Sequence, residues 1–253
     1  MKTIRLLGAM TALPSFLIFF TASNAVEAQT GTPCVPTPSG LVASWRAENN
    51  ADDSISTNNG TPVGGVTYTN GEVGQAFSFD NVNTSTSYIP LPASPSLDIG
   101  SGSGLTIECW IQPDAAVLPG GAPIIEWDSA TTDGVQLWVG LSAAIRDTSG
   151  NANIIQAPAG LLNTNNFQHV AVTYDKSSGN AYLYYNGSIV ASANFGNITP
   201  QTTYPVNIGR RTGQPIGNGS NYGGLIDELS LYNRALSSNE IAAIYGAGSG
   251  GKC

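Results

Sequence analysis

Short apolar runs separated by turn-forming residues are the feature that most restricts how this chain can fold. In YLYYNGSIVAS, for example, Asn186 and Gly187 separate two apolar runs. Asn-Gly at such a place favours a tight hairpin turn, because both residues adopt positive φ easily. Many short strands at this spacing predict an all-β sandwich of about 12 to 14 strands. We expect strands near residues 41–46, 66–69, 75–79, 87–91, 105–112, 123–128, 135–141, 144–147, 168–174, 181–185, 189–193, 206–209 and 224–232.

One short helix is expected near residues 238–245. Ser237 is followed three residues later by Glu240, the spacing of a capping box. The segment IAAIY that follows has helical spacing, and Gly246 is expected to end the helix.

The first 28 residues have the organisation of a secretory signal peptide. Lys2 and Arg5 precede an apolar run over residues 6–20, and small residues lead to cleavage after Ala28 or, as an alternative, after Ala25. The apolar run is shorter than the roughly 20 residues of a spanning helix, so no membrane span is expected after signal removal. We expect an extended Pro/Gly-rich leader over residues 29–40 and one folded domain over residues 41–253.

The chain is acidic and poor in lysine. It carries 17 Asp and Glu against 9 Lys and Arg, a net charge of −8, and removing the signal peptide makes this one unit more negative. Such a surface argues against nucleic acid and anionic membranes as partners.

Five segments in order resemble the laminin-G-like jelly-roll domains of bacterial exported proteins. They are GLVASWRAENNADDSISTNNGT, GEVGQAFSFDN, GLTIECWIQP, NFQHVAVTYDKSSGNAYLYYNGSIVAS and GLIDELSLYNRALSSNEIAAIY, and together they extend from about residue 40 to residue 245. The resemblance implies a two-sheet antiparallel jelly roll of the concanavalin A-like kind. It also implies a bacterial protein that is exported to the periplasm or the cell exterior.

The same fold carries sugar-binding lectins, adhesion modules and some glycoside hydrolases, so the fold alone does not decide the function. We expect a non-catalytic module that binds a glycan or a surface protein. The alternatives are a structural or protein-interaction jelly roll and, with less support, a glycoside hydrolase.

Catalytic residues are not expected. His169 is the one histidine, which excludes a His-rich zinc site, and the resemblance implies that it is a structural part of its strand. A glycosidase needs two carboxyl groups facing one cleft, and the nearest candidates are Glu126 and Asp128. We interpret these two as the end of a surface strand.

The resemblance implies one structural calcium ion near the N-terminal loop and the final strand. Glu48 and Asp227 are the leading candidate ligands, with Asn50 and Asp53 as further ones, since calcium prefers several hard oxygens. Alternation in GLIDELSLY places Asp227 on one face with Leu229 and Leu231. A carboxylate buried there needs either a cation or backbone N–H groups as partners.

Ligand-binding residues are the least determined. The long loop GRRTGQPIGNGSNYGG offers Arg210, Arg211, Asn218 and Tyr222 as candidates, because binding residues concentrate on loops. Trp110 and Trp138 each alternate with apolar residues on their strands. Either could belong to a sugar site, and for Trp110 we expect instead that it covers a second sheet layer.

The three cysteines allow one disulfide and one free thiol. Cys109 alternates with Leu105, Ile107 and Ile111, so it should face the core. In the fold implied by the resemblance the first and last strands lie close together, so we expect Cys34 to pair with Cys253. The alternative is that Cys253 stays free or forms an intermolecular bond.

Overall fold

The computed structural model describes residues 33–80, 87–118, 121–129, 131–212 and 221–253. Contacts divide the chain into residues 1–30 and residues 31–253, and all described residues belong to the second unit. The expected signal peptide and Asn218 lie outside the described residues. Within the described residues, none of the helices has the length and apolar character needed to cross a bilayer.

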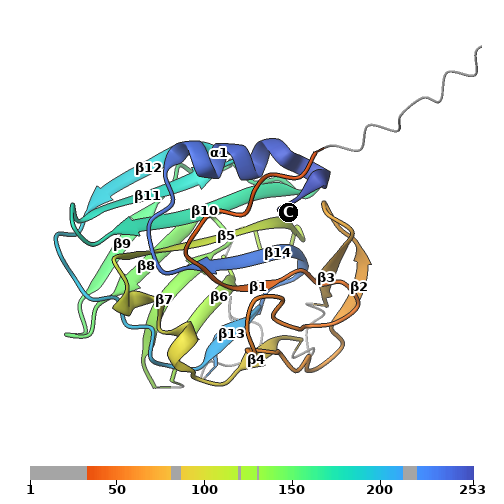
Figure 1. Cartoon of the computed structure of the whole chain (residues 1–253). Coiled ribbons are helices and arrows are strands. Elements are labelled where there is room, and N and C mark those ends of the chain that lie inside the picture. The colour runs from red at the N-terminus through yellow and green to blue at the C-terminus, as the bar shows by residue number, and fades with distance from the viewer. Residues whose placement is uncertain (1–32, 81–86, 119–120, 130, 213–220) are drawn as a thin grey trace, which may run out of the picture. The chain divides into compact units, whose positions relative to one another are not determined.

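Two antiparallel sheets pack face to face, as predicted (Figure 1). The larger sheet has the order β12-β11-β10-β5-β14-β3-β2, with β1 also paired to β14, and the smaller has the order β4-β13-β6-β7-β8-β9. The strands are β1 (Leu41–Trp45), β2 (Thr67–Asn70), β3 (Gln75–Phe79), β4 (Ile89–Leu91), β5 (Gly104–Pro113), β6 (Pro123–Asp128), β7 (Asp133–Trp138), β8 (Ser142–Arg146), β9 (Ala152–Gln156), β10 (Gln168–Asp175), β11 (Asn180–Tyr185), β12 (Ser188–Asn194), β13 (Val206–Ile208) and β14 (Gly224–Tyr232).

The main core fills the space between the sheets, where alternate residues of each strand point inward. Cys109 of β5 lies there as a buried free thiol beside Ile107 and Ile111, as predicted. Burial raises the pKa of this thiol well above its usual value, so it behaves as a small apolar side chain.

Strand β9 was not expected from the sequence. Of its five residues only Ile155 is fully buried, and Ile154 is 64 % exposed. A short edge strand of this kind has little apolar alternation, which explains why the sequence pattern missed it.

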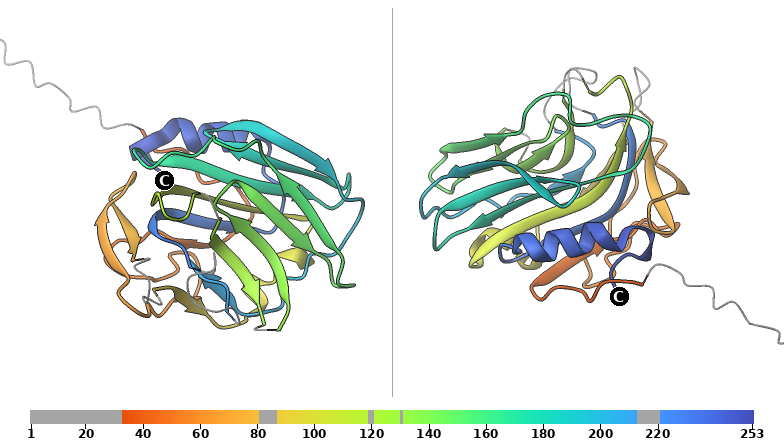
Figure 2. Two further views of the ribbon diagram at one scale, coloured as in Figure 1. Left: turned by 180° about the vertical axis from the view of Figure 1, so that it is seen from behind. Right: turned by 90° about the horizontal axis from the view of Figure 1, so that it is seen from above.

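Helix α1 (Ser238–Ala247) begins with the predicted capping box, in which Ser237 and Glu240 exchange side-chain to backbone hydrogen bonds. The expected end at Gly246 is wrong. The helix continues to Ala247 and passes into a 3₁₀ turn over Gly248–Gly250, because the residue with positive φ is Gly248. Figure 2 shows α1 along the outer side of the eight-stranded sheet, opposite the six-stranded sheet.

The alternation predicted for β14 is also wrong, because a bulge interrupts it. Asp227 pairs with Trp110 and Ser230 pairs with Glu108, so between these pairs two residues of β14 lie opposite one residue of β5. Glu228 within the bulge has a φ of 51°. Asp227 therefore lies on the outer face with Trp110, whereas Leu229 and Leu231 belong to the main core.

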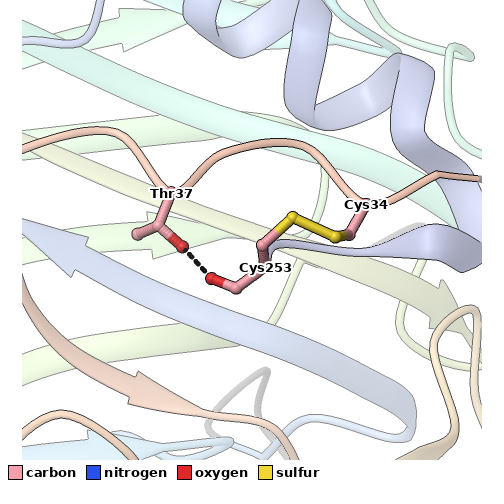
Figure 3. Close-up of a disulfide and its surroundings, with 3 residues drawn as sticks. All are labelled: Cys34, Thr37 and Cys253. Atoms are coloured by element: carbon pink, nitrogen blue, oxygen red, sulfur yellow. Dashed lines mark hydrogen bonds between the residues drawn. A yellow bond between two sulfur atoms is a disulfide. The ribbon is translucent and has the colours of Figure 1, made fainter.

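A disulfide joins Cys34 to Cys253, with 5.2 Å between the two Cα atoms (Figure 3). The segment around Val35 runs parallel to the last residues, and Val35 pairs with Lys252. Thr37 donates a hydrogen bond to the carbonyl oxygen of Cys253 at 2.7 Å. The predicted pairing is confirmed, and the described part of the leader is held against the C-terminal tail.

This tail places a lysine among buried acids on the outer face of the eight-stranded sheet. Lys252 Nζ lies 3.1 Å from both Glu108 Oε1 and Glu228 Oε2, and His169 Nε2 lies 3.1 Å from Glu108 Oε2. Burial alone would raise the pKa of Glu108, but the charge of Lys252 holds it below its usual value. We call Glu108, His169, Glu228 and Lys252 the buried ionic cluster.

Helix α1 covers the neighbouring part of the same face. Ile241 and Ile244 pack with Tyr184 and Tyr232 in a second apolar cluster. Trp110, 5 % exposed, has its ring centroid 5.7 Å from that of Tyr245 of α1, so it is buried beneath this helix and not against the second sheet layer that was expected. Part of this face stays open at a hollow of about 340 Å³ that Tyr182 and Arg234 line.

Candidate functional site

Alternation along β7 and β8 decides which side chains reach the outer face of the six-stranded sheet. Val135 and Leu137 point into the core, so Gln136 and Trp138 point outward. On the paired strand β8, Ala144 lies opposite Gln136 and Ser142 lies opposite Trp138. These four outward residues form the floor of the candidate surface.

Arg211, which follows β13, joins this floor to the acidic end of β6. Its guanidinium lies 4.6 Å from the ring centroid of Trp138. It donates to Glu126 Oε1 at 2.8 Å and to Gln136 Oε1 at 2.7 Å. Trp138 Nε1 donates to the other Glu126 oxygen at 3.2 Å. Three separate segments thus fix Trp138 and Arg211 in place, while both stay partly exposed.

Burial dominates the electrostatics of Glu126. Its side chain is fully buried, and burial raises its pKa from 4.5 to about 7, although the hydrogen bond and charge of Arg211 act in the opposite direction. Burial thus outweighs the stabilisation of the Glu126 carboxylate by Arg211 and Trp138.

A second set of polar contacts extends the surface beyond Glu126. Asp128 accepts hydrogen bonds from the backbone N–H and the hydroxyl of Thr212, each at 2.6 Å. Asp133 pairs with Arg146 at 3.1 Å and also accepts a hydrogen bond from Gln136. The acidic groups of this end are thus engaged by neighbouring donors.

Three hollows lie along this surface. The largest has a volume of about 490 Å³ and is lined by Trp138 together with the loop around Pro158–Leu162. The second, about 260 Å³, lies over Ala144 and Ile154. The third, about 70 Å³, lies at Asp128 and Asp133.

The sequence matches the concanavalin A-like lectin/glucanases superfamily over residues 83–242, which is more than half of the chain. The chain belongs to this superfamily. The match begins at residue 83. Strands β1, β2 and β3 and the first disulfide cysteine, Cys34, come before it in the chain. No protein of curated function matches the sequence.

Solved structures with the same fold are distant in sequence. The binding domain of Paraclostridial Mosquitocidal Protein 1 has a TM-score of 0.65 at 19 % identity, over 81 % of this chain and 52 % of that one. The binding domain of botulinum neurotoxin serotype G has a TM-score of 0.62 at 17 % identity, over 81 % and 50 %. This chain thus spans about half the length of these toxin domains.

Domain 4 of AbnA, an extracellular arabinanase from Geobacillus stearothermophilus solved with arabinotriose, is matched over nearly its whole length. It has a TM-score of 0.55 at 19 % identity, over 80 % of this chain and 96 % of that domain. At these identities the likeness establishes the two-sheet fold that this concanavalin A-like domain shares with them.

The predicted pair Arg210 and Arg211 is divided between two places. Arg211 lies on Trp138, whereas the guanidinium of Arg210 lies 5.0 Å from the ring centroid of Tyr88. Tyr222 is fully buried against Phe79 and donates to the carbonyl oxygen of Leu225, so we remove it from the candidate ligand residues.

Sequence reasoning did not associate Glu126, Gln136 and Trp138 with Arg211, because the residues come from β6, β7 and the segment after β13. One signal was present in the sequence, since a tryptophan alternating with Val135 and Leu137 must face away from the core.

Two expected calcium ligands, Glu48 and Asp227, lie at the turn between β2 and β3. Asp227 Oδ2 accepts the N–H of Val73 at 2.9 Å, and Glu48 Oε1 accepts the N–H of Gln75 at 3.2 Å. Asp227 Oδ1 is buried and has no hydrogen-bond partner of good geometry. Burial raises the Asp227 pKa to about 8, although the backbone N–H groups of Val73 and Glu228 act to lower it. An unpartnered buried carboxylate oxygen fits a cation ligand.

The other two expected ligands are engaged within their own loop. Asp53 accepts hydrogen bonds from Ser44 and Ser56, among others, and these hold its pKa below the usual value although burial acts to raise it. Asn50 donates to the carbonyl oxygen of Glu48 and accepts from the N–H of Asp52. Among the described residues no three His, Cys, Asp or Glu side chains form a metal-binding group.

Proposed function

We propose that this protein is an exported, non-catalytic module that binds carbohydrate on the outer face of its six-stranded sheet. The observation that carries the proposal is the partly exposed Trp138, held by Glu126 and flanked by the donors and acceptors of Arg211 and Gln136. An aromatic surface beside a few fixed polar groups suits sugar rings, which present both C–H faces and hydroxyl edges.

Two further observations support the proposal. One structural relative is a domain of an extracellular arabinanase solved with arabinotriose. The Cys34–Cys253 disulfide supports a place in the periplasm or outside the cell, because such bonds persist in oxidising compartments.

A glycan array probed with the mature protein tests the proposal. We expect binding to a group of related glycans, at least about tenfold weaker for Trp138→Ala, as for other aromatic hot-spot residues. Tyr182→Ala is the matched control, because Tyr182 is a partly exposed tyrosine lining a 340 Å³ hollow on the other sheet. A blank array combined with self-association in sedimentation would instead favour a protein-interaction module.

The proposal does not assign catalysis to Glu126 and Asp128, the nearest candidates for a glycosidase pair. Glu126 is fully buried and bonded to both Arg211 and Trp138, and Asp128 is bonded to Thr212. These contacts support a structural role for both carboxyl groups. Release of reducing ends from a bound polysaccharide, abolished by Glu126→Gln, would contradict this part of the proposal.

We also propose one structural calcium ion held by Asp227 and Glu48 at the β2–β3 turn. The unpartnered Oδ1 of Asp227 supports it. Millimolar calcium should raise the melting temperature by mass action, and Asp227→Asn should remove most of that rise. An unchanged melting curve after chelation of the purified protein would refute the calcium site.

A further inference from the structure

The three hollows on the six-stranded sheet share wall residues. Trp138 and Ser142 line both the 490 Å³ hollow and the 260 Å³ hollow. Arg211 lines both the 260 Å³ hollow and the 70 Å³ hollow. Because each neighbouring pair meets at common side chains, the hollows follow one another in a single line, which we call the trough.

The trough follows strand β7. Its acidic end includes Asp133, the first residue of β7, and its middle includes Gln136 and Trp138. Beyond Trp138 it continues beside Pro158 and Leu161. Six residues of extended strand cover roughly 17 Å, and the largest hollow lies beyond that length. The trough is therefore much longer than a single sugar ring.

The charges of the trough disfavour an anionic ligand. Its described lining residues include three carboxyl groups, those of Glu126, Asp128 and Asp133, and one cation, Arg211, while Arg146 pairs with Asp133 from beside the lining. The Arg211 guanidinium already donates hydrogen bonds to Glu126 and Gln136, so its charge is largely compensated within the protein. The chain as a whole carries a net charge of −8, which adds repulsion.

The middle of the trough offers apolar area as well. Ile154 of β9 is 64 % exposed and lines the same hollow as Trp138 and Ala144. Exposed apolar side chains beside an aromatic ring can cover the C–H faces of successive sugar units, while the hydroxyl of Ser142 supplies a hydrogen bond.

We propose that the trough takes an extended, uncharged glycan chain of several sugar units, laid along β7 from the Asp133 end to the Leu161 end. The inference rests on the proposed carbohydrate binding and adds the length and the charge of the ligand. The domain would then bind internal segments of a polysaccharide, because the end group of a chain alone would fill only one of the three hollows.

Titration calorimetry with two series of oligosaccharides tests the inference. The neutral series comprises linear arabino- and cello-oligosaccharides from one to six units, and the anionic series comprises oligogalacturonates of the same lengths. We expect the affinity for at least one neutral series to rise by about tenfold or more between the shortest and longest members. The oligogalacturonates should bind more weakly at every length and gain affinity when salt is added.

Two variants test whether the hollows act as one trough. Ala144→Trp fills the central hollow and should remove the dependence on chain length, leaving weak binding of short oligosaccharides. Tyr182→Ala on the other sheet should leave the whole length series unchanged. Circular dichroism and melting curves establish that both variants fold.

The outcomes separate this inference from the proposed function. Affinity independent of length, or stronger binding of the galacturonates, would overturn the extended neutral ligand while leaving carbohydrate binding intact. Binding of none of these probes, together with a blank glycan array, would refute both.

Discussion

Replacing Lys252 by methionine should be among the most destabilising single changes in this domain. The lysine is 3 % exposed and lies 3.1 Å from both Glu108 and Glu228, which are 0 % and 4 % exposed in their side chains. Methionine keeps most of the volume and removes the charge. Two buried carboxylates then lose their shared cation, and breaking a buried ion pair in this way costs about 3–5 kcal/mol.

The magnitude translates into an easily measured shift. For a domain of this size each kcal/mol moves the melting temperature by about 2–4 °C, so Lys252→Met should melt roughly 6–20 °C below the wild type at pH 7. Urea unfolding should give a lower midpoint with an unchanged slope. The triple variant Lys252→Met, Glu108→Gln, Glu228→Gln should recover much of the loss, because it leaves no buried charge unpaired.

The pH dependence supplies an independent check. Lys252 holds the pKa of Glu108 below its usual value, so this contribution is present above the unfolded pKa and is lost as the pH falls through the folded pKa. In Lys252→Met Glu108 can protonate instead, and the gap in unfolding free energy between variant and wild type should narrow towards pH 4. A loss below about 1 kcal/mol at pH 7, or a gap that widens in acid, would refute this account of the cluster.

Three further outcomes follow from other contacts. Replacing Cys34 and Cys253 by serine should cost about 2–5 kcal/mol in denaturant unfolding, and non-reducing peptide mapping should recover these two residues as the linked pair. Because burial raises the Glu126 pKa from 4.5 to about 7, the folded state binds this proton more tightly and stability should fall as the pH rises between these values; Glu126→Gln should flatten that part of the urea-midpoint profile. Ser237→Ala should lower stability by about 1 kcal/mol, because α1 loses its N-cap, and an unchanged melting temperature would argue against the capping box.

Local patterns explain why much of the fold could be predicted from the sequence. Asn186-Gly187 predicts the β11–β12 hairpin and Ser237 with Glu240 predicts the start of α1, because each signal depends on residues only a few positions apart. The register of β14 could not be obtained in this way. The bulge at Glu228 depends on its pairing with β5, and simple alternation places Asp227 on the wrong face.

The candidate site was less predictable because it is assembled from distant segments. Arg211 and Glu126 are 85 residues apart in the chain and meet only when β13 pairs with β6. Composition and loop length singled out Arg211, yet they gave equal weight to Arg210 and to Tyr222, which the structure places against Tyr88 and in the core. Pairing between strands that are distant in the sequence decides where each of these three residues lies, and a short stretch of sequence does not contain that information.

The covered face of the eight-stranded sheet has a consequence for how such a domain can be displayed. The Cys34–Cys253 disulfide lies on that face, whereas the trough opens on the outer side of the six-stranded sheet. An anchor or fused partner attached beside this disulfide would therefore hold the domain by the outer face of its eight-stranded sheet. The proposed binding surface would then face away from the attachment point. Several copies on one scaffold could bind the same polymer strand, with the gain in avidity that tethering provides.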